Sequence, residues 1–250
     1  MNLPPFKLER YFAKYEFNTE YLLCSSDCEA MPIADLLAME SGASEQFQQV
    51  WLGYTESQGH PDLRREIAKI YETIQPEEIL VHTGAEEAIF LFMLAALKEG
   101  DRIIVHTPHY QSLSEIARGM GCMVDVWQAR EENNWALDLA ELKDLLHPNT
   151  KAIILNTPHN PTGYLMTGSD FEALHGFAQE NNLLLFCDEV YRESEYDPSQ
   201  RLPAGCDKGE HAVSLGVTSK TYGLAGLRIG WIATKNRNIY ERMASLKDYT

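Results

Sequence analysis

The chain has 250 residues, of which 44% are hydrophobic and 23% charged, enough for a large globular core and too apolar for a disordered protein. Its 21 basic and 37 acidic residues give a net charge of −16. Nucleic acids and anionic membrane surfaces are bound through basic patches, so this balance argues against both as partners. No apolar run has the length of a membrane-spanning helix.

Five cysteines are scattered along the chain. Cys24 and Cys28 are the only close pair, and no second pair or nearby histidine stands at the spacing of a metal site, so we expect no metal. The odd cysteine count and the lack of a signal-peptide pattern predict a reducing, cytoplasmic location.

Residues 1–45 contain several prolines and a polar loop, and we expect an irregular N-terminal arm that precedes a large domain at 46–250. From residue 60 onward, apolar strand patterns alternate with helix patterns. The predicted helices are 60–74, 86–97, 111–121, 138–146, 168–182 and a last one after 234. The predicted strands are 79–84, 102–108, 122–128, 151–158, 183–191, 212–220 and 228–234. The strands are short and apolar on both faces, which predicts a three-layer α/β/α domain with a seven-stranded, mostly parallel sheet.

Polar side chains follow the carboxyl ends of these strands, in "HTGAEE", "HTPHY", "NTPHNPTG", "DEVY" and "TSK". Ligands of such sheets bind beyond the carboxyl ends of the strands. Taken singly, most of these stretches have an ordinary explanation: "TGAEEA" is compatible with a plain strand-to-helix turn, and Tyr110 with a packing residue. Asp188 and Lys220 are harder to explain, because each ends an apolar strand, and a buried charge there needs a partner.

Together these stretches supply what a pyridoxal 5′-phosphate (PLP) site needs. The site requires an amine for a Schiff base, a carboxylate for the pyridine nitrogen, an aromatic face for the ring, and a cationic, N–H-rich cradle for the phosphate.

Three motifs carry a family resemblance: "HNPTG" (159–163), "DEVY" (188–191) and "SKTYGLAGLRIGW" (219–231). With them the chain resembles fold-type-I PLP-dependent enzymes of the class I/II aminotransferase group, over roughly residues 50 to 250. The resemblance implies that Lys220 forms the Schiff base and shuttles the proton, and that Asp188 pairs with the pyridinium nitrogen. It further implies that Asn160 and Tyr191 hydrogen-bond the phenolic oxygen.

The same resemblance assigns the rest of the cofactor site. Tyr110 would stack on the ring, the backbone N–H groups of Ala85 and Glu86 would face the phosphate, and Arg228 would clamp it. Many members have a phosphate-binding serine at the position of Val217, and Thr218 or Ser219 would compensate for its loss here. Tyr54 matches a tyrosine that reaches the neighbouring subunit's phosphate, which implies a homodimer with shared active sites; a packing role for Tyr54 is the alternative.

The chain also departs from the family pattern. The loop "CSSDCEAMP" (24–32) replaces a glycine-containing substrate loop, and Asp27 and Glu29 in it could favour a substrate with a cationic side chain. The resemblance further implies that the small C-terminal domain, with the arginine for the substrate α-carboxylate, is absent from a chain that ends at Thr250.

The sequence therefore predicts a PLP-dependent aminotransferase that moves an amino group from an amino acid to a 2-oxo acid. Two kinds of alternative stay open. The same residues would serve another fold-type-I reaction, such as those of a β-lyase, a decarboxylase or a cyclase. A truncated PLP-binding or interaction module without catalysis is the other.

Overall fold

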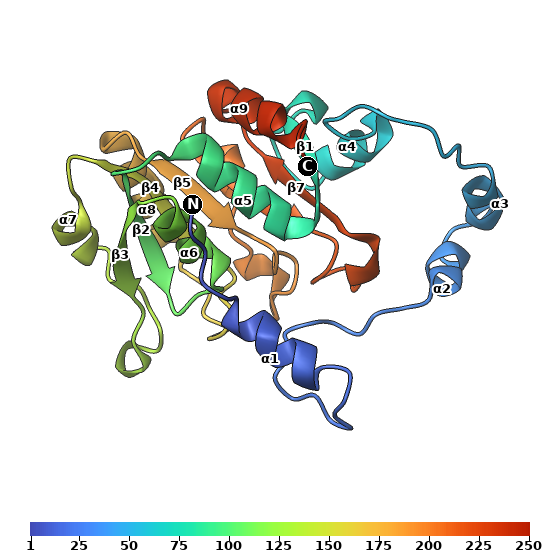
Figure 1. Cartoon of the computed structure of the whole chain (residues 1–250), viewed down its shortest axis with the longest axis horizontal. Helices are drawn as coiled ribbons and strands as arrows, with labels where there is room; N and C mark the ends of the chain where they lie inside the picture. Colours follow the sequence, from blue (N-terminus) through green and yellow to red (C-terminus); the bar gives the residue numbers. More distant parts are fainter.

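A computed structural model describes all of residues 1–250, and at its centre lies a single seven-stranded sheet (Figure 1). The strands lie in the order β1-β7-β6-β5-β4-β2-β3. Their bounds are β1 Ile79–Thr83, β2 Arg102–Thr107, β3 Met123–Gln128, β4 Thr150–Asn156, β5 Leu184–Asp188, β6 Ala212–Val217 and β7 Ile229–Ala233. Only β7 runs antiparallel to its neighbours, so the expectation of a mostly parallel sheet is confirmed.

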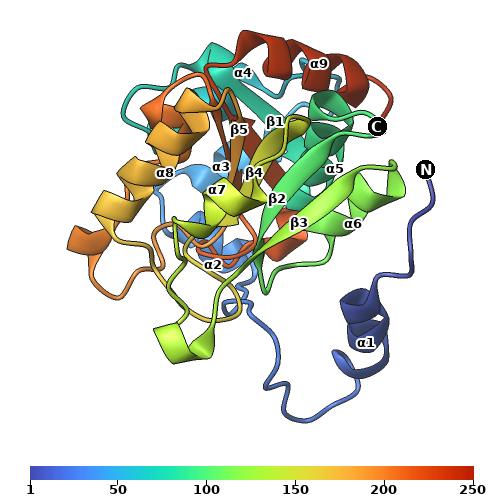
Figure 2. The same ribbon diagram turned by 90° about the vertical axis from the view of Figure 1, so that its left-hand side faces the viewer.

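Helices cover both faces of the sheet. They are α1 Lys7–Tyr15, α2 Ile33–Ala38, α3 Ala43–Gln48, α4 Pro61–Ala68, α5 Gly84–Ala96, α6 Ser112–Gly119, α7 Glu141–Leu145, α8 Gly168–Glu180 and α9 Arg237–Lys247. Buried side chains of α5, α6 and α9 pack on one face, whereas α7 and α8 pack on the other and α4 covers β1 and β7. Figure 2 shows α5 and α8 on opposite sides of the strands. The three-layer prediction is thereby confirmed.

The strands alternate between these two cores with the period of two that extended chains impose. Along β5, Phe186 belongs to the core under α5, whereas Leu185 and Cys187 belong to the core under α8. Such strands are apolar on both faces, which is why their positions could be predicted from the sequence.

Two predictions about helices were wrong. Residues 1–45 are not irregular throughout, because they contain α1 and α2 and the start of α3. The α1 sequence, KLERYFAKY, is made largely of good helix formers that follow the early prolines. The helix expected over 60–74 ends at Ala68, because β-branched residues and then Pro76 follow and disfavour its continuation.

The segment with α2 and α3 runs outside the body of the molecule (Figure 1). Neither helix has a buried residue. None of the helices is long and apolar enough to cross a membrane.

Candidate functional site

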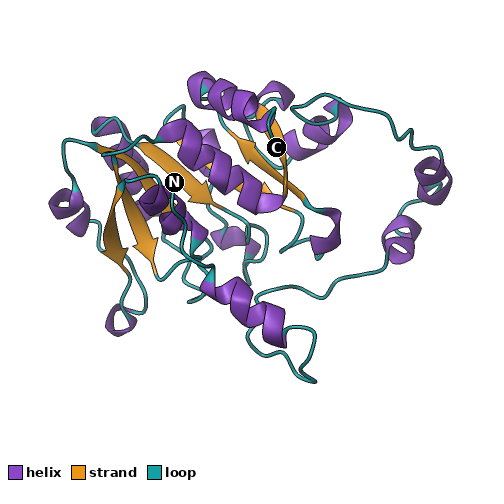
Figure 3. Cartoon of the chain, viewed as in Figure 1, coloured by secondary structure: helices purple, strands orange, loops and turns teal.

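A cavity of about 520 Å³ lies beyond the carboxyl ends of β4, β5 and β6. In Figure 3 the arrows of the parallel strands point toward the edge at which α1 lies. The loops after these strands and the start of α5 form its inner wall, and α1 with residues 24–27 forms its outer wall. Nine predicted site residues line it: Ala85, Glu86, Tyr110, Asn160, Asp188, Tyr191, Ser219, Lys220 and Arg228.

Lys220 lies in the loop that follows β6, three residues beyond the strand end at Val217, so the predicted strand 212–220 is shorter than expected. Its Nζ donates a hydrogen bond to the Asp27 carboxylate and lies 3.5 Å from Ser26 Oγ. It also lies 6.0 Å from the centroid of the Tyr191 ring. Burial opposes the charge on Lys220, but Asp27, Tyr191 and Asp188 outweigh it, and the pKa of this amine lies above its ordinary value.

Asp188 is the last residue of β5 and is almost fully buried. Its register neighbours are Asn156 on β4 and Leu215 on β6. The backbone N–H of Val190 donates to Asp188 Oδ1 at 3.3 Å, and the side chain has no other hydrogen bond in the chain. Burial raises the pKa of Asp188 to about 7, because a charged carboxylate loses its hydration there and no cation is bonded to it.

Asn160 and Tyr191 meet in the cavity that Asp188 also lines, although 31 residues separate them in the sequence. Asn160 Nδ2 donates to Tyr191 Oη at 2.9 Å, and Tyr191 Oη donates to Ser26 Oγ at 2.8 Å. The backbone N–H of Asn160 donates to Asn156 Oδ1 at 2.8 Å, which fixes the start of this loop on β4. Two polar side chains from the loops after β4 and β5 are thus hydrogen-bonded to each other in the cavity.

Tyr110 follows β2 and lines the cavity, where its ring contacts a residue of the N-terminal arm. The ring centroids of Tyr110 and Phe6 lie 4.9 Å apart. Tyr110 Oη donates to Glu9 Oε1 at 2.7 Å. Burial and this contact with Glu9 hold the pKa of Tyr110 above its ordinary value. The arm therefore fixes the orientation of the aromatic side chain.

The start of α5 forms a cradle with Arg228. Gly84, the first residue of α5, has a φ of +79°, and a Cβ built there would lie 2.6 Å from Arg228 Nη2. The guanidinium of Arg228 donates to Ala225 O at 3.3 Å and has no carboxylate partner. A helix N-terminus with free N–H groups and an adjacent unpaired guanidinium favours an anion.

The first turn of α5 holds two acids, Glu86 and Glu87, of which only Glu86 lines the cavity. Glu86 Oε2 accepts a hydrogen bond from Ser112 Oγ at 3.0 Å. Burial raises the pKa of Glu86, and the hydrogen bond from Ser112 partly offsets this rise.

Thr218 and Tyr54 do not line the cavity. The Thr218 hydroxyl bonds to the backbone oxygens of Leu224 and Ile229 at 3.3 and 3.2 Å, so it holds the Lys220 loop. Ser219, in contrast, faces the cavity. Tyr54 is fully exposed in the segment after α3.

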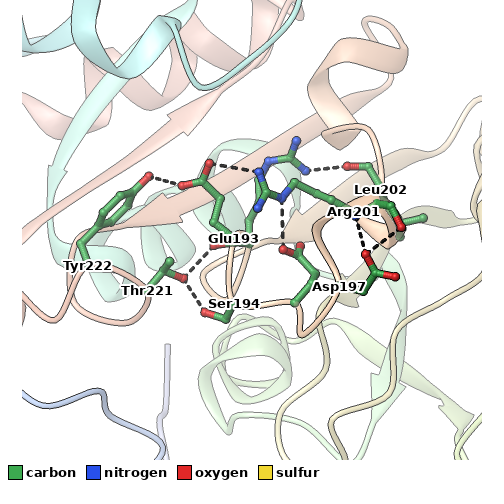
Figure 4. A network of polar contacts seen from close by, with 10 residues as sticks. Glu193, Ser194, Asp197, Arg201, Leu202, Thr221 and Tyr222 are labelled. Atoms are coloured by element: carbon green, nitrogen blue, oxygen red, sulfur yellow. Dashed lines mark hydrogen bonds and ion pairs between the residues drawn. The ribbon is translucent and has the colours of Figure 1, made fainter.

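Hydrogen bonds connect the loops after β5 and β6 (Figure 4). Thr221 Oγ1 donates to Arg192 O at 2.7 Å and lies 2.8 Å from Ser194 Oγ. Tyr222 Oη donates to Glu193 Oε2 at 2.9 Å. These bonds fix the residues that directly follow Tyr191 against those that directly follow Lys220.

Sequence reasoning missed most of the outer wall. It noted Asp27 but not Ser26 or Glu9, and the structure places all three on the cavity. Their contacts span at least 100 residues of sequence, and nothing in a short polar loop indicates such partners. Glu29, proposed with Asp27, does not line the cavity.

The residues present fit a pyridoxal 5′-phosphate. The buried Asp188 carboxyl has room for a cationic ring nitrogen as partner, and the cradle of Gly84 and Arg228 suits a phosphate. Asn160 and Tyr191 offer polar groups for a phenolic oxygen, near the amine of Lys220. An amine, an acid and an anion site in one cavity are the parts that this cofactor's chemistry requires.

Comparisons with known proteins show the family to which the chain belongs. The family model described as aminotransferase class I and II matches residues 21–249. An aspartate aminotransferase of Sulfurisphaera tokodaii is 29% identical over 83% of this chain and 54% of its own length. One of Pyrococcus abyssi is 32% identical over 78% of this chain and 52% of its own length.

Solved structures of aminotransferases share the fold of this chain. A PLP-dependent aminotransferase from Streptococcus suis superposes with a TM-score of 0.92 at 31% identity, and the match covers 100% of this chain and 67% of that one. The chain spans about half the length of the curated relatives it matches.

Proposed function

The chain belongs to the class I and II aminotransferase family, and from that premise we propose that it is the cofactor-binding part of a PLP-dependent transaminase. Its substrates would be an amino acid and a 2-oxo acid. The observation that carries the proposal is the convergence of Lys220, Asp188, Asn160 and Tyr191 on one cavity beside the anion cradle.

When bound, the cofactor supplies an aldehyde for amine exchange and a ring that accepts electrons from the substrate carbon. Lys220 is the amine that would hold the cofactor covalently and that would move a proton at the reacting carbon of the substrate. Asp188 keeps the ring nitrogen protonated, since a buried carboxylate favours a proton on its partner. Asn160 and Tyr191 orient the ring, Tyr110 covers its face, and Arg228 with the N–H groups of Ala85 and Glu86 holds the phosphate.

The homodimer belongs to the same proposal. Tyr54 and its neighbours Trp51 and Leu52 are exposed, as a segment would be that packs on a second copy and reaches its phosphate. We also propose that residues 1–45 act as an arm and 46–250 as the cofactor domain. All five cysteines are free thiols, in keeping with the expected cytoplasmic location.

A second candidate function follows from length. Because the chain spans about half the length of its curated relatives, a PLP-binding module that does not catalyse transamination is the alternative. The other fold-type-I reactions differ from transamination in how the substrate bonds are oriented, and that depends on parts of the relatives that this chain does not match.

One experiment separates these functions. Purified chain is mixed with PLP, and its visible absorbance is recorded before and after each amino acid of a panel. A cofactor band that shifts with a subset of amino acids, with release of the matching 2-oxo acid, supports transamination. A band that no amino acid changes indicates the binding module, and the absence of a band contradicts the proposed cofactor.

A further inference from the structure

Five polar side chains surround one point at the mouth of the cavity. They are Ser26, Asp27, Asn160, Tyr191 and Lys220. Three come from the loops after β4, β5 and β6, and two from the N-terminal arm. The proposed function gives roles to the three loop residues and none to the two arm residues.

Asp27 has one cationic partner, the amine of Lys220. Its other contact is with the hydroxyl of Ser25 in its own loop, at 3.0 Å. Burial raises the pKa of Asp27, but the hydrogen bond and charge of Lys220 outweigh it and hold that pKa below the ordinary value. Asp27 is therefore an anion at neutral pH, held within hydrogen-bond reach of the amine on which the proposed reaction depends.

Four other acids line the cavity, and none of them is hydrogen-bonded to Lys220. Asp188 contributes to the raised pKa of Lys220 through its charge, but its side chain accepts a hydrogen bond only from the Val190 N–H. Glu9 accepts a hydrogen bond from Tyr110, and Glu86 accepts one from Ser112. Glu16 lines the cavity from the end of α1 and makes no contact with Lys220. Asp27 is the carboxylate that the structure places at the amine.

In the proposed reaction Asp27 loses its cationic partner, the ammonium of Lys220. Once Lys220 Nζ is bonded to the cofactor carbon, it is no longer an ammonium with three donors. The nitrogen that replaces it there is the substrate amino group, which arrives as a primary ammonium of the same shape and charge. Resting on the proposed function, we infer that Asp27 docks the substrate ammonium at the position that the ammonium of Lys220 occupies in this structure.

The exchange of the Lys220 amine for the substrate amine needs no oxidant, reductant or other reagent. A carbon–nitrogen bond to the substrate forms, and the carbon–nitrogen bond to Lys220 breaks. The substrate ammonium gives up one proton, and the departing amine of Lys220 takes one up. Asp27 would stabilise whichever amine is charged at this position. Ser26 holds the arm there by accepting a hydrogen bond from Tyr191.

Two small amines that have no carboxylate group, methylamine and hydroxylamine, test this docking role. Methylamine is a cation at neutral pH, whereas hydroxylamine is uncharged, and both displace a lysine from bound PLP. In Asp27→Asn the methylamine reaction followed by absorbance should slow about tenfold or more, because a charge-assisted hydrogen bond is lost. The hydroxylamine rate should change less than twofold, which also shows that the variant is folded and has bound PLP.

The control variant is Glu29→Gln, at an exposed neighbour outside the cavity, and it should match wild type with both amines. Equal effects on both amines, or none on methylamine, would overturn the role of Asp27.

A second readout needs no cofactor. Acetic anhydride modifies uncharged amines, and mass spectrometry reports modification at Lys220 as a function of pH. Asp27→Asn should raise the Lys220 rate at neutral pH several-fold by lowering the pKa of that amine, and an unchanged rate overturns the inference. If Lys220 responds as expected but wild-type chain does not load PLP, the proposed function fails and the docking role falls with it.

Discussion

Asp188 and Glu189 are consecutive buried carboxyl groups that point to different surroundings. Asp188 faces the cavity, whereas Glu189 accepts hydrogen bonds from the Gly205 N–H at 2.6 Å and from Ser214 Oγ at 3.1 Å on the other side. Burial raises the pKa of both to about 7. Both carboxyl groups therefore resist ionisation in the folded chain without cofactor. As a result, the free energy of unfolding depends on pH.

The sign of this dependence follows from proton uptake. Asp188 has an ordinary pKa of 3.8 and a pKa of about 7 when folded, so folding takes up a proton between these values. Stability from this group is therefore full below the lower value and is lost as pH rises toward the higher one. Because folding raises the pKa of Asp188 from 3.8 to about 7, the free energy of unfolding falls by at most about 4 kcal/mol over this pH range.

Asp188→Asn removes this loss while keeping the side-chain shape. We expect the variant, without cofactor, to unfold at higher urea than wild type at pH 8, and the difference to vanish near pH 4. With PLP bound the order should reverse, since Asn cannot pair with a charged ring nitrogen. A variant that is less stable than wild type at pH 8 without cofactor would contradict the assigned pKa.

At the scale of residues, the sequence was sufficient for the inner wall of the site. Asp188 ends an apolar strand, and Lys220, Asn160 and Tyr191 stand just beyond one, and parallel strands bring such positions together. It was not sufficient for Ser26 as a partner of Tyr191, because their contact spans 165 residues and depends on where an exposed arm folds back.

At the scale of elements, the contact between β7 and the start of α5 positions the anion cradle. A Cβ on Gly230 would lie 2.5 Å from the Gly84 carbonyl carbon and 2.8 Å from Ala85 N. These are backbone atoms, so neither side can yield by turning a side chain. The helix N-terminus can approach the strand this closely only because residue 230 is glycine.

Gly230→Ala should therefore separate β7 from α5. We expect a loss of about 1–3 kcal/mol in the free energy of unfolding, as in other overpacked sites, and at least tenfold weaker binding of PLP. Urea unfolding and a cofactor titration measure the two effects. Gly176→Ala on α8 has nothing within 4 Å of the added Cβ and should be neutral or slightly stabilising. Similar behaviour of the two variants would show that this contact does not form the cradle.

The elements themselves were predictable where burial dominates. Every predicted strand from 79 onward is present, because two-sided burial leaves a continuous apolar run. Helix ends and the N-terminal helices were less predictable. α1, α2 and α3 bury no residue, so the continuous burial that marks the strands in the sequence is missing there, although Leu8 and Phe12 of α1 share one face and line the cavity.

At the scale of the whole molecule, the segment after α3 is the largest departure from a compact shape. Trp51 is 82% exposed and Leu52 is 95% exposed. Two large apolar side chains in sequence on an extended segment are typical of a surface that a partner covers. In the proposed dimer that partner is a second copy.

Changing both residues to serine should weaken self-association. We expect wild-type chain to sediment as a dimer at micromolar concentration, and the Trp51→Ser, Leu52→Ser variant to shift toward monomer with unchanged circular dichroism. Tyr196→Ser changes an equally exposed aromatic in the loop after β5 and serves as control. A wild-type chain that remains monomeric at all concentrations would contradict the shared-site dimer.

In the proposed function Lys220 is the covalent anchor of the cofactor, and borohydride reduction tests this role directly. The chain is loaded with PLP, reduced with borohydride, digested, and its peptides are mapped by mass spectrometry. We expect a single modified peptide that contains Lys220, and no modified peptide in Lys220→Ala. A stoichiometric adduct on another lysine, or one that persists in Lys220→Ala, would contradict it.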